Sequence, residues 1–149
     1  MIKDTRSNSI YIRFFIKGKD IDPDEITQLL GITPAYKYKR GDLHGENNQM
    51  VRKQGLWSIT SAEKIESSDL QLHIEWLLTQ LEPVKSPLSS IVSRPDIYAE
   101  ISCIFNLFTI EWDDRLEPNL LERIAALNIM FGISIYCLNN LENRLNDVS

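Results

Sequence analysis

The feature of the sequence that most constrains the fold is a change of hydrophobic period near its start. Residues 10–18, IYIRFFIKG, alternate with period two, so that Ile10, Ile12, Phe14 and Ile16 share one face. Such alternation is typical of a half-buried strand. The chain is therefore expected to begin with a strand that buries one face in a core.

The next segment, DIDPDEITQLLGITP, carries the signals that start and stop a helix. Asp22 is an N-cap residue, Pro23 suits the first helical position, and Glu25 follows the cap at the capping-box spacing. Gly31 provides a left-handed stop before Pro34. These residues predict a helix of about two turns directly after the first strand.

Residues 32–56 then run without a helical pattern. A connection of about 25 residues is too long to be structureless in a compact domain. The simplest arrangement is a hairpin in which AYKYKR and QMVRKQGLWSITS are antiparallel strands and GDLHGENN is the turn between them.

The rest of the chain continues to alternate between helical and strand-like segments. DLQLHIEWLLTQLEP has apolar residues at helical spacing, and Ser68 with Gln71 provides an S-x-x-Q capping box. SPLSSIVSRP is predicted to be a loop from its composition. YAEISCIFNLF is a period-two strand, EPNLLERIAALNI is a helix that begins at Pro118, and GISIYCL is a final strand.

The predicted order is strand, helix, hairpin strands, helix, strand, helix, strand. Helices interleaved with strands in this way indicate an α+β fold, with a mostly antiparallel sheet and helices packed on one face. The topology that fits best is a ferredoxin-like split βαβ variant with an inserted helix. The chain is expected to be a single domain, 1–149, with an ordered core over about 9–138 and a polar tail at 139–149.

Five segments occur in a fixed order, in a match that covers most of residues 10–137: GKDIDPDEITQLLGITP, KRGD, GLWSITS, DLQLHIEWLLTQLEP and GISIYCL. In order and spacing they resemble a family of small bacterial proteins known only as a domain of unknown function. The shared pattern is a D-P-x-x-I-T-x-x-L-G-x-x-P helix, a K-x-G-D element, a G-x-W-S strand and a W-L-L helix. The resemblance implies a bacterial, single-domain protein, and no catalytic residues are carried over from it.

The charged residues are unevenly distributed along the chain. The formal net charge is −5, with 43% hydrophobic and 25% charged residues, as in ordinary globular proteins. Residues 1–53 carry ten Lys or Arg and seven Asp or Glu, whereas residues 54–149 carry six and fourteen. The acidic balance argues against a dedicated nucleic-acid binder, although a local basic patch leaves such a partner open.

No segment of the sequence indicates a membrane or an export pathway. No apolar run approaches the roughly 20 residues that cross a bilayer, and the start MIKDTRSNS is polar with no signal-peptide h-region after it. Cys103 and Cys137 lie in strand-like segments at a spacing that fits no zinc or redox motif, so we expect buried free thiols. We therefore expect a cytoplasmic protein without a membrane partner.

The sequence contains no catalytic signature. His44 and His73 lack the second ligand of a metal motif, and the acidic run 111–117 lacks the glycine and spacing of a calcium loop. There is no G-x-S-x-G, no glycine-rich phosphate loop, and no cysteine placed beside a histidine in a motif. We expect no enzymatic activity, no metal and no cofactor, and we expect Trp57 and Trp76 to be core anchors.

One local feature has the character of a site, namely the basic hairpin 36–53. Its charge is opposite in sign to that of the whole chain, and its lysines alternate with tyrosines. The alternative is an edge hairpin that uses its lysines to prevent aggregation. The candidate binding residues are Lys37, Tyr38, Lys39, Arg40, Arg52 and Lys53.

These observations favour a non-enzymatic binding or interaction module. Small size, acidic charge and the lack of catalytic groups favour another protein as the partner. The alternative is a module that binds a phosphate-bearing small molecule or an RNA segment through the basic hairpin. The sequence leaves the chain's own state open between a monomer and a homodimer.

Overall fold

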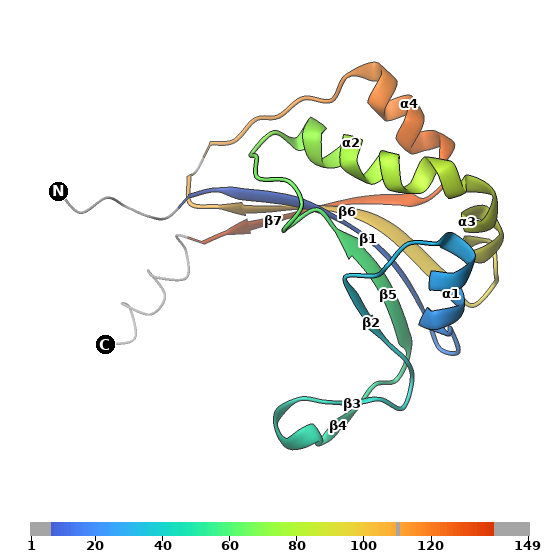
Figure 1. Cartoon of the computed structure of the whole chain (residues 1–149). Coiled ribbons are helices and arrows are strands. Elements are labelled where there is room, and N and C mark those ends of the chain that lie inside the picture. The colour runs from blue at the N-terminus through green and yellow to red at the C-terminus, as the bar shows by residue number, and fades with distance from the viewer. Residues whose placement is uncertain (1–6, 110, 139–149) are drawn as a thin grey trace, which may run out of the picture.

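The computed structural model describes residues 7–109 and 111–138, which form a five-stranded sheet, a separate two-stranded ribbon and helices that cover one face of the sheet (Figure 1). The strands are β1 (Ser9–Gly18), β2 (Tyr36–Tyr38), β3 (Leu43–His44), β4 (Met50–Val51), β5 (Gly55–Thr60), β6 (Ile97–Leu107) and β7 (Met130–Cys137). The helices are α1 (Pro23–Leu30), α2 (Leu70–Leu81), α3 (Lys85–Val92) and α4 (Pro118–Ala126).

The sheet has the strand order β2-β5-β1-β6-β7. Neighbouring strands run antiparallel except β6 and β7, which are parallel. The predicted α+β class with a mostly antiparallel sheet is therefore confirmed. The predicted polar tail at 139–149 lies outside the described residues.

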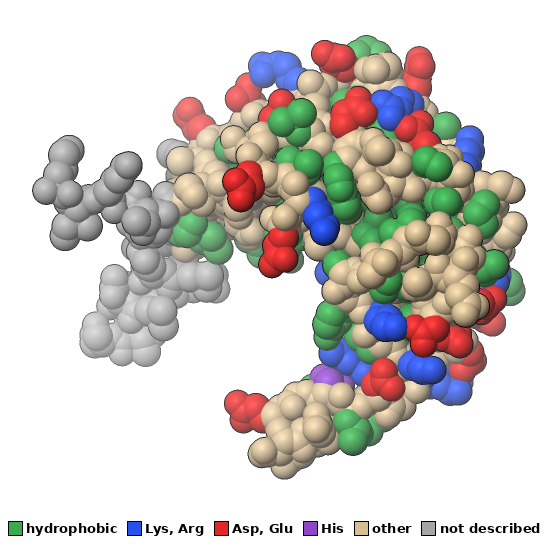
Figure 2. Space-filling model, viewed as in Figure 1, with side chains coloured by type: hydrophobic (Ala, Val, Ile, Leu, Met, Phe, Trp, Pro, Cys, Tyr) green, Lys and Arg blue, Asp and Glu red, His purple; other side chains and the backbone are tan. Residues whose placement is uncertain are grey.

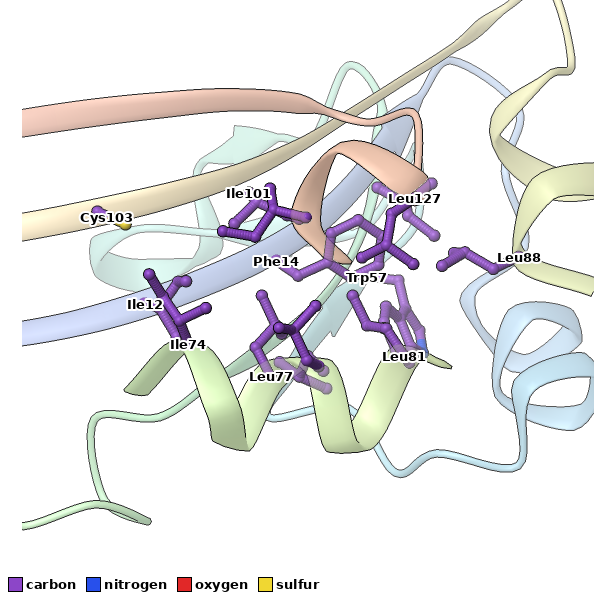
Figure 3. Close-up of a cluster of buried hydrophobic side chains, with 14 of the residues drawn as sticks. Ile12, Phe14, Trp57, Ile74, Leu77, Leu81, Leu88, Ile101, Cys103 and Leu127 are labelled. Carbon is purple, nitrogen blue, oxygen red and sulfur yellow. The ribbon is translucent and has the colours of Figure 1, made fainter. Parts of the chain in front are cut away.

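The predicted alternation of β1 is confirmed. β1 pairs with β6 along its whole length and with β5 from Arg13 to Gly18, so the backbone groups of its second half have partners on both sides. Its apolar residues point to the helices, where Ile12, Phe14 and Ile16 are fully buried. Figure 3 shows the core that results, with labelled side chains Ile12, Phe14, Trp57, Ile74, Leu77, Leu81, Leu88, Ile101, Cys103 and Leu127.

Asp22 and Gly31 cap α1 as the sequence predicts, whereas Glu25 pairs with Arg94 at 3.0 Å and not with the backbone of the cap. Asp22 accepts a hydrogen bond at Oδ1 from the backbone N–H of Asp24, at 3.0 Å. Gly31 adopts the left-handed conformation with φ 65°, and its N–H donates to the carbonyl of Thr27 at 2.8 Å. Both ends of this short helix are therefore closed by local chemistry.

The start of α2 differs from the prediction by one residue. The N-cap is Asp69, whose side chain accepts from the N–H of Gln71 at 3.0 Å, so the predicted capping box at Ser68 is wrong. A carboxylate at this position also complements the positive end of the helix dipole, which a serine hydroxyl does less well.

The prediction of a loop after α2 is wrong, because α3 occupies most of it. Serines and a proline give this segment a weak helical pattern. Pro87 lies in the first turn, however, where a missing N–H costs little. Leu88 and Ile91 are fully buried, so packing against the core stabilises a helix that local propensity does not specify.

The predicted hairpin is present and consists of two parts. Close to the sheet, β2 pairs with β5, with Lys37 opposite Trp57. Further out, β3 pairs with β4 in a ribbon that projects from the body of the molecule (Figure 1). Gly41 has φ 93° where the two parts meet, a conformation that favours glycine. We refer to residues 43–51 as the ribbon.

The last helix is fixed to α2 by one arginine. Arg123 donates hydrogen bonds to Glu82 at 2.5 Å and to Glu75 at 3.0 Å, and these bonds raise the pKa of its guanidinium.

After α4 the chain forms β7, the edge strand. Cys103 is buried as expected, but Cys137 is exposed because it lies on this edge, so that part of the thiol prediction is wrong. None of the helices in the described ranges has the length and apolar character needed to cross a bilayer.

Candidate functional site

The candidate site is the face of the sheet that points away from the helices. Alternation along β1 sends Arg13, Phe15 and Lys17 to this side. No helix among the described residues covers it (Figure 1). We call it the open face, and its residues include Tyr11, Arg13, Phe15, Lys17, Tyr36, Tyr38, Leu56, Ser58, Thr60, Tyr98, Glu100 and Ser102.

Cations lie over aromatic rings at the centre of the open face. The guanidinium of Arg13 is 4.9 Å from the ring centroid of Phe15. The ammonium of Lys17 is 5.6 Å from the same centroid and 4.8 Å from that of Tyr98. Contacts of this kind hold the charged groups in place while leaving them accessible to water.

Glu100 is the carboxylate beside these cations. It accepts a hydrogen bond at 2.5 Å from the hydroxyl of Ser102 and a second from the hydroxyl of Tyr98. These bonds, followed by the charges of Lys17 and Arg13, lower the pKa of Glu100. The hydrogen bond to Glu100 also raises the pKa of the Tyr98 hydroxyl. Glu100 therefore remains ionised and balances part of the positive charge at the β6 side of the open face.

A second group of cation and rings lies at the β2 side. The guanidinium of Arg52 is 4.0 Å from the ring centroid of Tyr38 and donates a hydrogen bond to the hydroxyl of Tyr36 at 3.1 Å. The two tyrosine rings meet edge to face, with centroids 5.7 Å apart. Arg52 therefore ties the base of the ribbon to the edge of the open face.

Two hollows adjoin these groups. The larger, of about 1240 Å³, covers much of the open face and continues around the edge of β5 to Trp76 and Gln80 on α2. The smaller, of about 700 Å³, lies between the ribbon and the sheet. Both are lined by Tyr38, Arg52 and Gln54, so they form one continuous concave surface. Figure 2 shows the molecule hollowed between the ribbon and the body.

The lining of the two hollows is positively charged although the whole chain is acidic. Glu63 is the one acidic side chain among the described residues that line them. The formal charge of the complete chain is −5. The basic lining residues are Arg13, Lys17, Lys19, Arg52, Lys53 and Lys64.

The six residues proposed from the sequence do not gather at one place. Lys37 points to the opposite side of the sheet, where its ammonium pairs with Asp24 at 2.5 Å and lowers the pKa of that carboxyl. Arg40 pairs with Asp20 at 2.7 Å. The charges of Lys37 and Arg40 are therefore neutralised by carboxylates of α1 and of the segment before it.

Of the other proposed residues, Tyr38, Arg52 and Lys53 line the hollows. Lys39 lines neither hollow, and its backbone N–H donates to the side chain of Asp42 at 2.8 Å. The structure thus brings half of the proposed set to the concave surface.

Sequence reasoning missed the cations of β1 and the role of Trp76. Arg13 and Lys17 alternate with Phe15 on the polar face of the first strand, which is a signal that the sequence already carries. Trp76 is half-buried and lines the larger hollow, so the prediction that it is a core anchor is only partly right. Trp57, by contrast, is fully buried as expected.

A buried serine–histidine pair lies away from the open face. The hydroxyl of Ser61 is 2.6 Å from Nδ1 of His73, and Nε2 of His73 is 2.8 Å from the carbonyl of Ser67. Since a carbonyl only accepts, Nε2 donates to Ser67, and in the neutral imidazole Nδ1 then accepts from the serine. Ser61 also accepts from the N–H of Ile12, so the pair is saturated and closed to solvent. It fixes the loop before α2 and offers no free nucleophile.

The described ranges contain no cluster of three or more His, Cys, Asp or Glu that could hold a metal ion. The contacts described above are between charged groups and aromatic rings.

Comparison with known proteins identifies a family for the chain. A family model described as "Domain of unknown function (DUF4279)" matches residues 8–138, which is most of the chain. No curated protein and no solved structure matches the chain.

Proposed function

Since the chain belongs to the DUF4279 family, whose description names no activity, we propose its function from the open face: it is a non-enzymatic module that binds an acidic segment of another protein. The segment lies across the open face and under the ribbon, over the two hollows.

The observation that carries this proposal is the reversal of charge at the hollows. Arg13, Lys17 and Arg52 are held over aromatic rings, in the positions that a bound carboxylate can reach from the concave surface. A local positive potential on an acidic protein attracts an anionic partner and repels a basic one. Arginine and exposed tyrosine are also the residues that protein interfaces favour.

The state of the rings favours a protein segment over a nucleic acid. Base recognition on a sheet needs open aromatic faces on which bases stack. Here Phe15 is only 7% exposed, and cations lie over the rings of Phe15, Tyr38 and Tyr98. The net charge of −5 further opposes a long polyanion.

A second candidate is a phosphate-bearing small molecule in the smaller hollow. Lys19, Arg52, Lys53 and His44 line it, and these are side chains that bind phosphate oxygens. Such a ligand and the acidic segment would compete for Arg52. Inorganic phosphate therefore serves as a competitor in the experiment below.

We infer that the fold is a variant of the ferredoxin-like split βαβ arrangement. In chain order β1, α1, β2, β5, α2 and β6 alternate as that arrangement requires, and the strand order β2-β5-β1-β6 fits it. α3 is then the inserted helix, and α4 with β7 extends the sheet by one parallel strand.

The test is the affinity for a fluorescent peptide rich in Asp and Glu, measured by anisotropy. The double substitution Lys17→Gln with Arg52→Gln removes two cations from the concave surface. It should weaken binding by about 2- to 30-fold, since each exposed charge contact contributes about 0.2–1 kcal/mol. The matched control, Lys85→Gln with Arg115→Gln, makes the same change of charge at residues that line neither hollow, and it should leave the affinity unchanged.

Binding to the acidic peptide should also weaken as salt rises, while a basic peptide of equal length should not bind. Equal losses in the two double variants would mean that net charge alone acts, and would remove the open face as the site. Tighter binding of oligouridine RNA than of the peptide would replace the acidic segment with RNA. Full competition by inorganic phosphate would replace it with the phosphate-bearing small molecule.

A further inference from the structure

Among the residues that the structure describes, none pairs with the outer side of β7, the second edge of the sheet, which is an exposure that isolated proteins usually avoid. Its sequence, MFGISIYC, contains no charged residue and no proline. The large side chains are exposed on both faces: Met130 is 57% exposed, Ile133 63%, Ile135 61% and Tyr136 55%. Edge strands of monomers are normally short, charged or covered, because their free backbone groups pair with other strands.

The direction of the free backbone groups follows from one hydrogen bond. The N–H of Leu138 donates to the carbonyl of Leu107 on β6 at 2.8 Å. Backbone groups alternate in direction along a strand, so the even-numbered residues of β7 face β6. The odd-numbered residues therefore present their N–H and C=O groups outward; they are Phe131, Ile133, Ile135 and Cys137.

We propose that β7 pairs antiparallel with β7 of a second copy of this chain, in a register centred on Ser134, to give one continuous sheet across a symmetric dimer. In an antiparallel pair, two residues exchange hydrogen bonds only when both face the partner. Centring on Ser134 places Ile133 opposite Ile135 and Phe131 opposite Cys137, so every outward-facing residue of the strand is paired. Centring on Ile133 would leave Cys137 without a partner.

The side chains in this register complement one another on both faces. Ile133 and Ile135 form an apolar cluster with their counterparts on the helix side. On the open-face side, Gly132 lies opposite Tyr136 of the second copy. A Cβ at Gly132 would meet the carboxylate of Glu100, so a side chain there would require Glu100 to move. In this register a tyrosine ring from across the pair covers the glycine instead.

The helix that precedes β7 in the chain, α4, also exposes apolar side chains. Arg123 points towards α2, because it binds Glu75 and Glu82. Leu121 and Ala125 each lie about 200° around the helix from Arg123, and so face away from α2. Both are exposed, Leu121 by 51%. With no charged side chain on β7, two copies of this acidic chain approach along this edge without like charges opposed on the paired strands.

The dimer is tested first by sedimentation of the full chain, which should give twice the mass of one chain. Ile135→Lys places a charge in a paired position and should return the mass to that of one chain, with unchanged circular dichroism. A wild-type chain that sediments as a monomer at its highest soluble concentration would overturn the proposal.

The register is tested by disulfide formation in a Cys137→Ser background. Ser134→Cys should cross-link under mild oxidation, because the two Ser134 residues form a non-hydrogen-bonded pair about 4.5 Å apart between Cα atoms. Tyr136→Cys is the control. Tyr136 lies on the same face of the strand as Ser134 and is more exposed than Ser134, yet in this register the two Tyr136 residues are too far apart to form a disulfide. Equal cross-linking of both variants, or of neither, would overturn the register. The assay does not depend on the open face.

Discussion

The hydrogen bond between Trp57 and Thr27 connects the sheet to α1 and can be tested without changing the shape of the core. Trp57 is fully buried, and its indole N–H donates to the hydroxyl oxygen of Thr27 at 3.0 Å. That hydroxyl in turn donates to the carbonyl of Pro23, at 3.0 Å. The indole ring of Trp57 also meets the ring of Phe14 edge to face, with centroids 6.3 Å apart.

The informative change is Thr27→Val, which keeps the volume of the side chain and removes the acceptor. A buried donor left without a partner costs about 1–3 kcal/mol of the free energy of unfolding. Thr27→Ser keeps the acceptor and should cost less than Thr27→Val. Truncation by Trp57→Ala, for comparison, should cost about 3–5 kcal/mol because it empties the centre of the core.

A double-mutant cycle separates the hydrogen bond from packing. In a Trp57→Phe background there is no indole donor, so adding Thr27→Val should change the free energy of unfolding little, in contrast to its effect in the wild type. Urea denaturation followed by far-ultraviolet circular dichroism measures both effects. A Thr27→Val cost that is the same in the two backgrounds would refute the reasoning, because the loss would then come from the helix and not from the tryptophan.

Two other predictions follow from the titrating groups. Burial raises the pKa of the Cys103 thiol to about 12. In a Cys137→Ser variant, Ellman's reagent should therefore label Cys103 only after the protein unfolds. Rapid labelling of the native protein would contradict the burial of Cys103. The hydrogen bonds from Ser102 and Tyr98 lower the pKa of Glu100, so Glu100 contributes stability that is fully present above its unfolded pKa and is lost as the pH falls through its lowered folded pKa. Glu100→Gln should therefore make the free energy of unfolding less dependent on pH in that range, and an unchanged dependence would exclude this role.

The parts of the fold that could be predicted from the sequence are those with local signals. The alternation of β1 identified its buried face, and Asp22 with Gly31 marked both ends of α1. α3 could not be predicted in this way, because its helix depends on the burial of Leu88 and Ile91 against elements distant in sequence. Tertiary packing decides such a segment.

The candidate site shows why a basic run in the sequence does not define a basic surface. Lys37 and Tyr38 are neighbours, yet strand geometry sends them to opposite faces, and only the tyrosine reaches the hollow. Arg13 and Arg52 are far apart in sequence but are brought to one surface by the pairing of β1 with β5. The order of the strands, which fixes these neighbours, is a property of the assembled sheet.

The most direct test of the binding proposal is to map where the acidic peptide contacts the protein by nuclear magnetic resonance. Titration into ¹⁵N-labelled protein should shift the amide signals of open-face residues, with Arg13, Lys17, Tyr38 and Arg52 among the largest changes. The amides of α2 that face the core, such as that of Leu77, should stay in place. Largest shifts on the helical side, or at Lys37 and Arg40 without those four, would contradict the assignment of the open face as the binding site.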